Sequence, residues 1–257
     1  MFFILLSLFI ACVTAEAAGG EESALLRLND VPAAQAFIDS SEVAVIGFFE
    51  TDEARGYKEF LTAAKQMESL SVSVCGEKEV WAKYNITSDT ISIFRKADVH
   101  QKHLKLSEAK TVDADGLVRF FTINNIHYLT EYNQASAVGL FQSEVKTHLL
   151  LIANRDMSDF NKLKEKLRAL APKYTGKMLF VLVNGREKSN ALVLDYFKLR
   201  SRDLPRIAIY DGDSDRKWLM PKGEISTERV QNFCDSYLRG DLQKQSEAET
   251  SEDKTEL

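Results

Sequence analysis

Cysteines have the most reactive side chains in this chain, and none of the three lies near another: Cys12, Cys75 and Cys234. Thiol–disulfide exchange at a paired site needs two cysteines close together, with one thiol activated by a helix N-terminus or a positive charge. No Cys-x-x-Cys occurs in the chain, so exchange through such a pair is chemically excluded. Cys75 and Cys234 lie in apolar or helical stretches, which predicts buried thiols. A disulfide between them is the alternative.

The other side chains that often take part in catalysis show no catalytic spacing. Four histidines are present, His100, His103, His127 and His148. No helix or further ligand motif accompanies His100 and His103, and His148 falls within an apolar run typical of a buried strand. The chain has neither a Gly-x-Ser-x-Gly motif nor a phosphate-binding glycine loop. We therefore expect no enzymatic activity, no metal and no cofactor.

The charge pattern argues against two classes of function. The formal net charge is -5, and the chain has no basic stripe with interleaved aromatic residues, so nucleic acid is not an expected partner. Calcium buffering would require long acidic runs. The acids near the C-terminus alternate with lysine and serine instead.

Both ends of the chain carry features typical of targeting signals. Residues 2–11 are apolar and are followed by small residues at 13–15, which predicts a signal peptide over residues 1–15. The run is too short to cross a bilayer, and no other run is long enough, so we expect no membrane span. Residues 241–257 are polar and acidic and are predicted to be disordered. The last four residues resemble the Lys-Asp-Glu-Leu retrieval signal: Lys254, Thr255, Glu256 and Leu257.

These ends predict a protein of the endoplasmic reticulum lumen that a retrieval receptor binds. The secretory route would also make a glycosylation site usable. Asn85-Ile86-Thr87 is the only sequon in the chain, and it predicts a glycan on Asn85. An unused sequon is the alternative.

The body of the chain shows the same order of elements twice. In the first half we predict strands at 42–49, 72–75, 90–94 and 103–106, and helices at 55–67, 79–84 and 114–124. In the second half we predict strands at 147–152, 178–183, 206–210 and 218–220, and helices at 135–141, 158–170, 190–199 and 227–238. Ser226 is the expected N-cap of the last helix.

Equivalent elements lie about 110 residues apart, which indicates two copies of one α/β unit. Each unit ends in an antiparallel strand pair and a helix, the order found in thioredoxin-like domains. We therefore predict an α/β fold with two tandem thioredoxin-like domains, at residues 27–126 and 127–240. In this fold a cis-proline precedes the first of the two antiparallel strands, so Leu204-Pro205 is predicted to be cis.

Several runs give the chain a resemblance to the protein disulfide isomerase family. Residues 30–34, 42–49 and 84–87 resemble its non-catalytic b domain, and residues 130–133, 146–151, 176–181 and 196–199 resemble its b′ domain. The resemblance covers about residues 27–240 and is strongest to a two-domain member that lacks the catalytic domains. Where catalytic domains have Cys-x-x-Cys, this chain has Glu50-Thr51-Asp52-Glu53 and Ala153-Asn154-Arg155-Asp156. The resemblance thus implies a redox-inactive monomer.

The resemblance implies binding of unfolded or misfolded polypeptides in an apolar pocket of the b′ domain. The residues expected to line this pocket are Phe141, Tyr196, Phe197 and Ile207. An apolar pocket suits this task because unfolded chains expose apolar side chains of many kinds. Ordinary core packing is the alternative for each of the four residues.

The resemblance also implies recruitment of the calnexin- and calreticulin-associated disulfide isomerase. In the family this contact uses acidic residues around a tryptophan between the last two strands, and here the matching residues are Asp213, Asp215, Arg216, Lys217 and Trp218. Arg216 and Lys217 interrupt the acidic run, so an ordinary hairpin turn rich in aspartate and glycine is the alternative. The remaining functional alternative is an adaptor that binds the folded isomerase and no clients.

Overall fold

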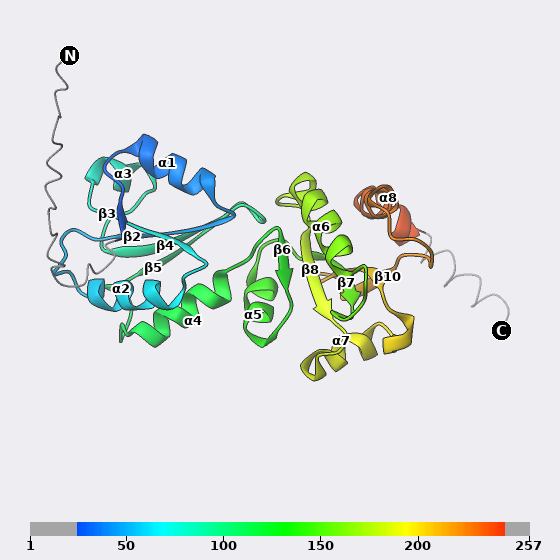
Figure 1. Cartoon of the computed structure of the whole chain (residues 1–257). Coiled ribbons are helices and arrows are strands. Elements are labelled where there is room, and N and C mark those ends of the chain that lie inside the picture. The colour runs from blue at the N-terminus through cyan, green and yellow to red at the C-terminus, as the bar shows by residue number, and fades with distance from the viewer. Residues whose placement is uncertain (1–24, 245–257) are drawn as a thin grey trace, which may run out of the picture.

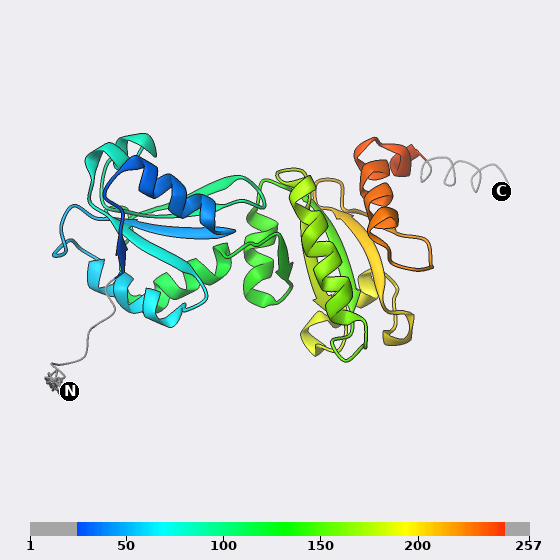
Figure 2. The ribbon, with the colours of Figure 1, turned by 45° about the horizontal axis from the view of Figure 1, so that its top comes forward.

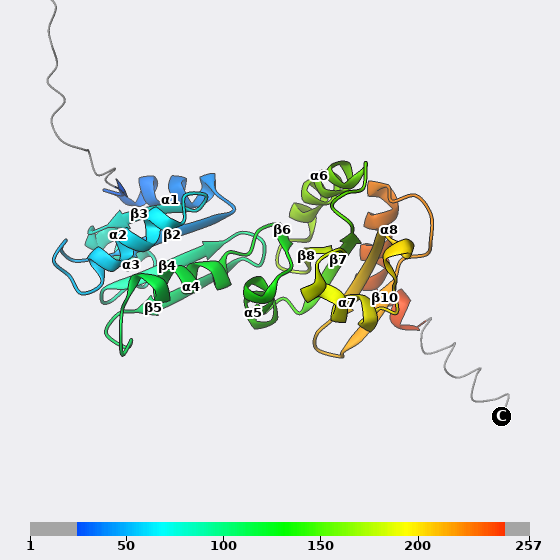
Figure 3. The ribbon, with the colours of Figure 1, turned by 60° about the horizontal axis from the view of Figure 1, so that its bottom comes forward.

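The computed structural model describes residues 25–244 and contains two five-stranded sheets, one after the other along the chain. Figure 1 shows the two α/β units side by side, and the turned views in Figures 2 and 3 show the same arrangement. The predicted signal peptide, the retrieval signal and residues 245–257 of the predicted tail lie outside the described residues.

The first unit contains strands β1 to β5 and helices α1 to α4. The strands are β1 (Leu26–Arg27), β2 (Val43–Phe48), β3 (Ser71–Cys75), β4 (Thr90–Arg95) and β5 (His100–Lys105), in the sheet order β1-β3-β2-β4-β5. The helices are α1 (Val31–Ser40), α2 (Tyr57–Gln66), α3 (Lys78–Lys83) and α4 (Ala114–Asn124). Strands β1, β3 and β2 are parallel to one another. Strand β4 pairs antiparallel with β2 on one side and with β5 on the other.

The second unit repeats this plan. Its strands are β6 (Leu129–Glu131), β7 (Thr147–Ala153), β8 (Leu179–Asn184), β9 (Arg206–Asp211) and β10 (Arg216–Leu219), in the order β10-β9-β7-β8-β6. Its helices are α5 (Gln134–Gln142), α6 (Phe160–Leu170), α7 (Ala191–Tyr196) and α8 (Thr227–Leu238), with short 3-10 turns at Ala171–Tyr174, Lys188–Asn190 and Ser201–Asp203. The predicted repeat of one α/β order is confirmed.

Each sheet is covered by helices on both faces, which explains its sequence pattern. Every residue of β2 is buried because α1 and α3 pack on one face of the first sheet and α2 and α4 pack on the other. All residues of β7 except the first are buried in the second sheet. In the second sheet α6 and α8 cover one face, and α5 and α7 cover the other. Strands buried on both faces read as continuous β-branched and apolar runs rather than as alternating ones.

Local signals fix several element ends. The Ser226 side chain accepts a hydrogen bond from the Arg229 backbone N–H at 3.2 Å, which confirms the predicted N-cap of α8. The Leu204-Pro205 peptide bond is cis, as predicted. Beyond α8, residues 241–244 are helical and Leu242 packs against the core, so the folded part extends past the predicted boundary at residue 240.

The two domains contact each other through a buried polar cluster and the packing of α4 against α5. Arg95 pairs with Asp98 at 2.7 Å, and both side chains are almost fully buried. Ser143 of the second domain donates to the Asp98 carboxylate at 2.8 Å. The first domain's Glu42 also accepts hydrogen bonds from the Tyr128 N–H at 3.0 Å and from Arg168 at 2.6 Å.

Glu42 lies half-buried between the domains. Burial opposes its ionisation, but the hydrogen bonds from Tyr128 and Arg168 outweigh burial and hold the pKa of this carboxyl below its ordinary value. The ionised carboxylate is thus the form that the domain contact favours.

Candidate functional site

The segments that stand where the family has catalytic cysteines occupy the ends of the two central strands. Glu50-Thr51-Asp52-Glu53 follows β2 and precedes α2, and Ala153-Asn154-Arg155-Asp156 begins with the last residue of β7 and precedes α6. The strand-to-helix geometry is present in both domains, but neither segment contains a thiol. The position therefore retains no group that could attack a disulfide.

Both cysteines of the described part are free and buried, so the prediction of buried thiols is confirmed. Cys75 lies on β3 of the first domain and Cys234 on α8 of the second. Burial raises the pKa of the Cys234 thiol to about 12 and also raises that of Cys75. A thiol that stays protonated at neutral pH is a poor nucleophile.

Within residues 25–244 no group of three or more histidine, cysteine or acidic side chains is arranged to hold a metal ion. His100 and His103 lie on β5, where Ser92 is 2.8 Å from the His103 Nδ1. No helix in this part of the chain is both long and apolar enough to cross a membrane.

An apolar cavity of about 220 Å³ opens on the second domain between α5, α7 and the sheet. Its lining is contributed by α5, three strands, the α7 region, one residue beside β6 and one in the β9–β10 turn. These residues are Tyr132, Phe141, His148, Leu150, Val181, Leu192, Val193, Tyr196, Phe197, Tyr210 and Asp215. We call this cavity the apolar pocket.

The structure brings three of the four predicted pocket residues together here. Phe141 is 52% exposed at the mouth, Tyr196 is half-buried, and Phe197 is 3% exposed and forms part of the wall. Ile207 does not line this pocket. It is buried on the opposite face of the sheet, under α6 and α8, and Tyr210 is the residue of β9 that reaches the pocket.

Strand alternation explains the position of Ile207. Side chains two residues apart on a strand share a face, so Ala208 and Tyr210 face α5 and α7 while Ile207 and Ile209 face away. The same period places His148 and Leu150 of β7 in the pocket. These two residues are not among the predicted pocket residues, although the period-2 pattern identifies them once the face covered by α5 and α7 is known.

Aromatic rings form a connected cluster around the pocket. Phe141 lies 6.3 Å from Tyr210 between ring centroids, Tyr210 lies 5.9 Å from Tyr196, and Tyr196 lies 5.3 Å from Phe197. The three pairs meet edge to face, the arrangement that aromatic quadrupoles favour. Leu192 adds an apolar side chain that is 80% exposed at the rim. Exposed apolar surface beside a cavity is a mark of a binding site.

The turn between β9 and β10 touches the pocket. The Tyr196 hydroxyl donates to the Asp215 carboxylate at 3.0 Å, and the Lys217 ammonium lies 3.7 Å from the Tyr196 ring centroid. Burial and the nearby Asp215 charge raise the pKa of Tyr196 to about 12, so its hydroxyl remains a donor at neutral pH.

His148 is a buried polar group in an otherwise apolar wall. It is 5% exposed, and its Nε2 has no hydrogen-bond partner. Burial lowers the pKa of His148 to about 4, although hydrogen bonds with the backbone at Val145 and Leu140 oppose the shift. The imidazole is therefore neutral at pH 7.

This pKa predicts a pH dependence of stability. Because the pKa in the folded state lies below the ordinary value of 6.5, the unfolded chain binds the proton more readily, and stability falls as the pH drops from about 6.5 towards 4. Between pH 7.5 and 5 we expect the wild type to lose about 2 kcal/mol more than a His148→Gln variant. Urea unfolding at both pH values measures this difference, and parallel losses in the two proteins would contradict it.

The predicted partner-binding residues are divided between the two faces of the β9–β10 hairpin. Lys217 lies on the α7 side, whereas Trp218 packs against Tyr237 of α8 at 5.2 Å between ring centroids, and its indole N–H donates to the Leu242 carbonyl. Asp213 and Asp215 are exposed in the turn, and Arg216 is exposed on β10. The structure therefore does not gather these side chains into one surface around the tryptophan.

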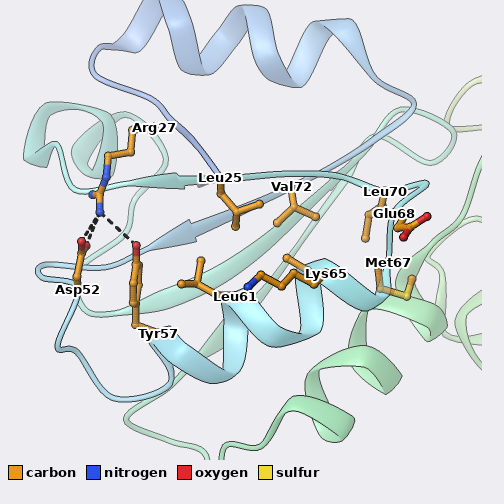
Figure 4. Close-up of a pocket in the computed structure, with 11 residues that line it drawn as sticks. Leu25, Arg27, Asp52, Tyr57, Leu61, Lys65, Met67, Glu68, Leu70 and Val72 are labelled. Atoms are coloured by element: carbon orange, nitrogen blue, oxygen red, sulfur yellow. Dashed lines mark hydrogen bonds and ion pairs between the residues drawn. The ribbon is translucent and has the colours of Figure 1, made fainter. Parts of the chain in front are cut away.

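A larger cavity, of about 740 Å³, lies in the first domain between α2 and strands β1 and β3 (Figure 4). Its rim is charged: Arg27 pairs with Asp52 at 2.6 Å and donates to the Tyr57 hydroxyl at 3.1 Å. Lys65 and Glu68 also line it. No sequence pattern pointed to this cavity, and its mixed charge suits an apolar side chain less well than the apolar pocket does.

The sequon lies on the surface of the first domain. Asn85 is exposed directly after the C-cap residue of α3, with a backbone φ of 57°. Asparagine is among the residues that adopt this left-handed conformation most readily.

Comparison with known proteins agrees with this geometry. A model of the thioredoxin-like domain matches residues 49–236. The chain is 39% identical to the endoplasmic reticulum resident protein 27 of Mus musculus and to that of Homo sapiens, over 90% of this chain and 85% of each relative. It is 27% identical to a protein disulfide-isomerase of Gallus gallus over 85% of this chain and 42% of that protein. The chain belongs to the protein disulfide isomerase family.

Membership of this family confirms the prediction of two tandem thioredoxin-like domains. The protein is a redox-inactive relative of the disulfide isomerases, and it resides in the lumen of the endoplasmic reticulum, as its relatives of that name do. A solved bb fragment of ERp72 matches 84% of this chain and 97% of the fragment, with 12% identity and a TM-score of 0.41.

Proposed function

We propose that the protein binds unfolded or misfolded polypeptides through the apolar pocket of its second domain and catalyses no reaction. The observation that carries this proposal is the open, ring-lined cavity with Phe141 and Leu192 exposed at its mouth. Apolar cavities of this kind accept side chains of many shapes, which suits clients that differ in sequence.

Phe141 is the side chain whose truncation tests the proposal most cleanly. Because Phe141 is 52% exposed, Phe141→Ala removes pocket surface at little cost to the stability of the fold. Truncation of the buried Phe197 would instead leave a cavity in the core. We expect the dissociation constant for an unstructured apolar peptide to rise about 10-fold in Phe141→Ala. Fluorescence anisotropy with a labelled peptide measures this.

Val138→Ala is the matched control, because Val138 is 40% exposed on the same helix and does not line the pocket. Its affinity should stay within about twofold of the wild type. Equal affinities in Phe141→Ala and the wild type would locate any binding elsewhere. Absence of peptide binding by the wild type would remove client binding from the function and leave an adaptor of a folded isomerase.

Recruitment of the calnexin- and calreticulin-associated disulfide isomerase is the second part of the proposal. The exposed Asp213 and Asp215 of the hairpin turn support it, because acidic side chains accelerate association with a basic surface. The separation of Lys217 and Trp218 on opposite faces counts against a contact centred on the tryptophan.

The exposed Asn85 supports a glycan at the sequon, which a mass decrease after deglycosylation would reveal.

A further inference from the structure

Another cavity of the second domain, of about 400 Å³, has a cation at four of its eight lining residues. Lys198, Arg206, Lys217 and Lys222 contribute four positive charges, and Asp203 contributes the single carboxylate, so the lining carries a net charge of +3. We call this cavity the cationic pocket. In a protein whose formal net charge is -5, this local excess of positive charge opposes the overall balance.

The positive charge is not neutralised within the described part of the chain. Among residues 25–244, no carboxylate pairs with the ammonium groups of Lys198 or Lys222. Arg206 donates to the Met220 carbonyl at 2.9 Å, and Asp203 accepts from the Arg200 backbone N–H at 2.9 Å. These contacts satisfy hydrogen-bond donors and acceptors but do not pair any of the positive charges with a carboxylate.

Three segments bring the cations together. In the β9–β10 pairing Lys217 lies opposite Tyr210 and Leu219 opposite Ala208, so both side chains share the face covered by α7. Lys198 follows α7 with a left-handed backbone φ of 54°, and Lys222 follows β10.

The cationic pocket adjoins the apolar pocket. Phe197 lines both cavities, and the Lys217 ammonium lies over the Tyr196 ring, which lines the apolar pocket. An extended peptide advances about 3.3 Å per residue. A client whose apolar side chain enters one pocket therefore has neighbouring side chains within reach of the other.

We propose that the second domain prefers clients in which carboxylates flank an apolar anchor, with the anchor in the apolar pocket and the carboxylates in the cationic pocket. This inference rests on the proposed function and names the class of client. Four cations in a recess attract carboxylates more strongly than a flat surface would, because low-dielectric walls concentrate the field.

The test uses three unstructured peptides of equal length with one aromatic anchor flanked by glutamate, glutamine or lysine. Anisotropy at low salt should show the glutamate peptide binding about 10-fold more tightly than the glutamine peptide, with the gap narrowing as salt is added. The double variant Lys198→Glu/Lys222→Glu should abolish the preference. The control variant Lys83→Glu/Lys102→Glu changes the net charge by the same amount on the first domain, and it should retain the preference for the glutamate peptide.

Equal binding of the glutamate and glutamine peptides would overturn the inference, as would a glutamate preference that survives Lys198→Glu/Lys222→Glu. The glutamine peptide separates this failure from that of the proposed function. If it binds the wild type and Phe141→Ala weakens it, the apolar pocket binds clients and only the preference for acidic flanks is wrong. If no peptide binds the wild type, both proposals fail.

Discussion

Replacement of Asp98 by alanine should lower the free energy of unfolding by about 3–5 kcal/mol, because it leaves the Arg95 guanidinium buried without its counter-charge. The Arg95 Nε and Nη2 atoms donate to the two Asp98 oxygens at 3.1 and 2.7 Å, and the two side chains are 3% and 0% exposed. The Ser143 hydroxyl would also lose its acceptor. A buried charge deprived of its partner is among the most costly single changes known in proteins.

Urea unfolding followed by tryptophan fluorescence measures this loss. The chain has two tryptophans, Trp81 on α3 of the first domain and Trp218 on β10 of the second, so each domain has its own reporter. Because Asp98 bonds across the domain contact, we expect both signals to shift to lower urea.

Asp156→Ala is the matched control for Asp98→Ala. Asp156 pairs with Arg186 at 2.8 Å, but the two side chains are about 60% exposed. Exposed ion pairs contribute about 0–1 kcal/mol. Similar small losses in the two variants would show that the Arg95–Asp98 pair is solvated and adds little to the domain contact.

Much of the fold was predictable from the sequence because the central strands and long helices carry strong patterns. The predicted helices at 114–124 and 227–238 match α4 and α8 in both bounds. The strands β1 and β6, with two and three residues, are too short to show any period. Helix α1 is not among the predicted elements, although Asp30 caps it by accepting a 2.7 Å hydrogen bond from the Ala33 N–H and Pro32 stands in its first turn.

The site was less predictable because its walls come from segments that meet only in three dimensions. Phe141 on α5 and Phe197 at the end of α7 could be chosen from the family resemblance. The face of a strand residue such as Ile207 depends instead on which helices cover which side of the sheet. The cationic pocket depends on the strand register that places Lys217 opposite Tyr210 and on the turn after α7 that holds Lys198. The domain contact joins Asp98 to Ser143 across 45 positions, and no local pattern encodes such a pair.

Substitution of Gly139 by alanine is expected to have the second large effect on the free energy of unfolding. Its sign is opposite to the one that helix propensity predicts. In an ordinary helix, glycine to alanine stabilises by about 1 kcal/mol. Gly139 lies in α5 where this helix meets the end of α4, and a Cβ there would overlap the backbone carbonyl of Ile123 and lie 3.4 Å from the Ile126 Cδ1. A backbone atom cannot rotate away as a side chain can. Gly139→Ala should therefore destabilise the protein by about 2–3 kcal/mol.

Gly116→Ala in α4 isolates this effect from helix propensity. A Cβ at Gly116 would meet only the Asp113 side chain, at 3.2 Å, so stability should stay unchanged or rise by up to about 1 kcal/mol. Urea unfolding of the two variants gives the comparison directly. A stabilised Gly139→Ala would mean that α4 and α5 do not approach this closely in solution. A destabilised one, with both tryptophan signals shifted, would show that close contact between the domains requires glycine at this position, and would explain why a residue that weakens isolated helices stands in the middle of α5.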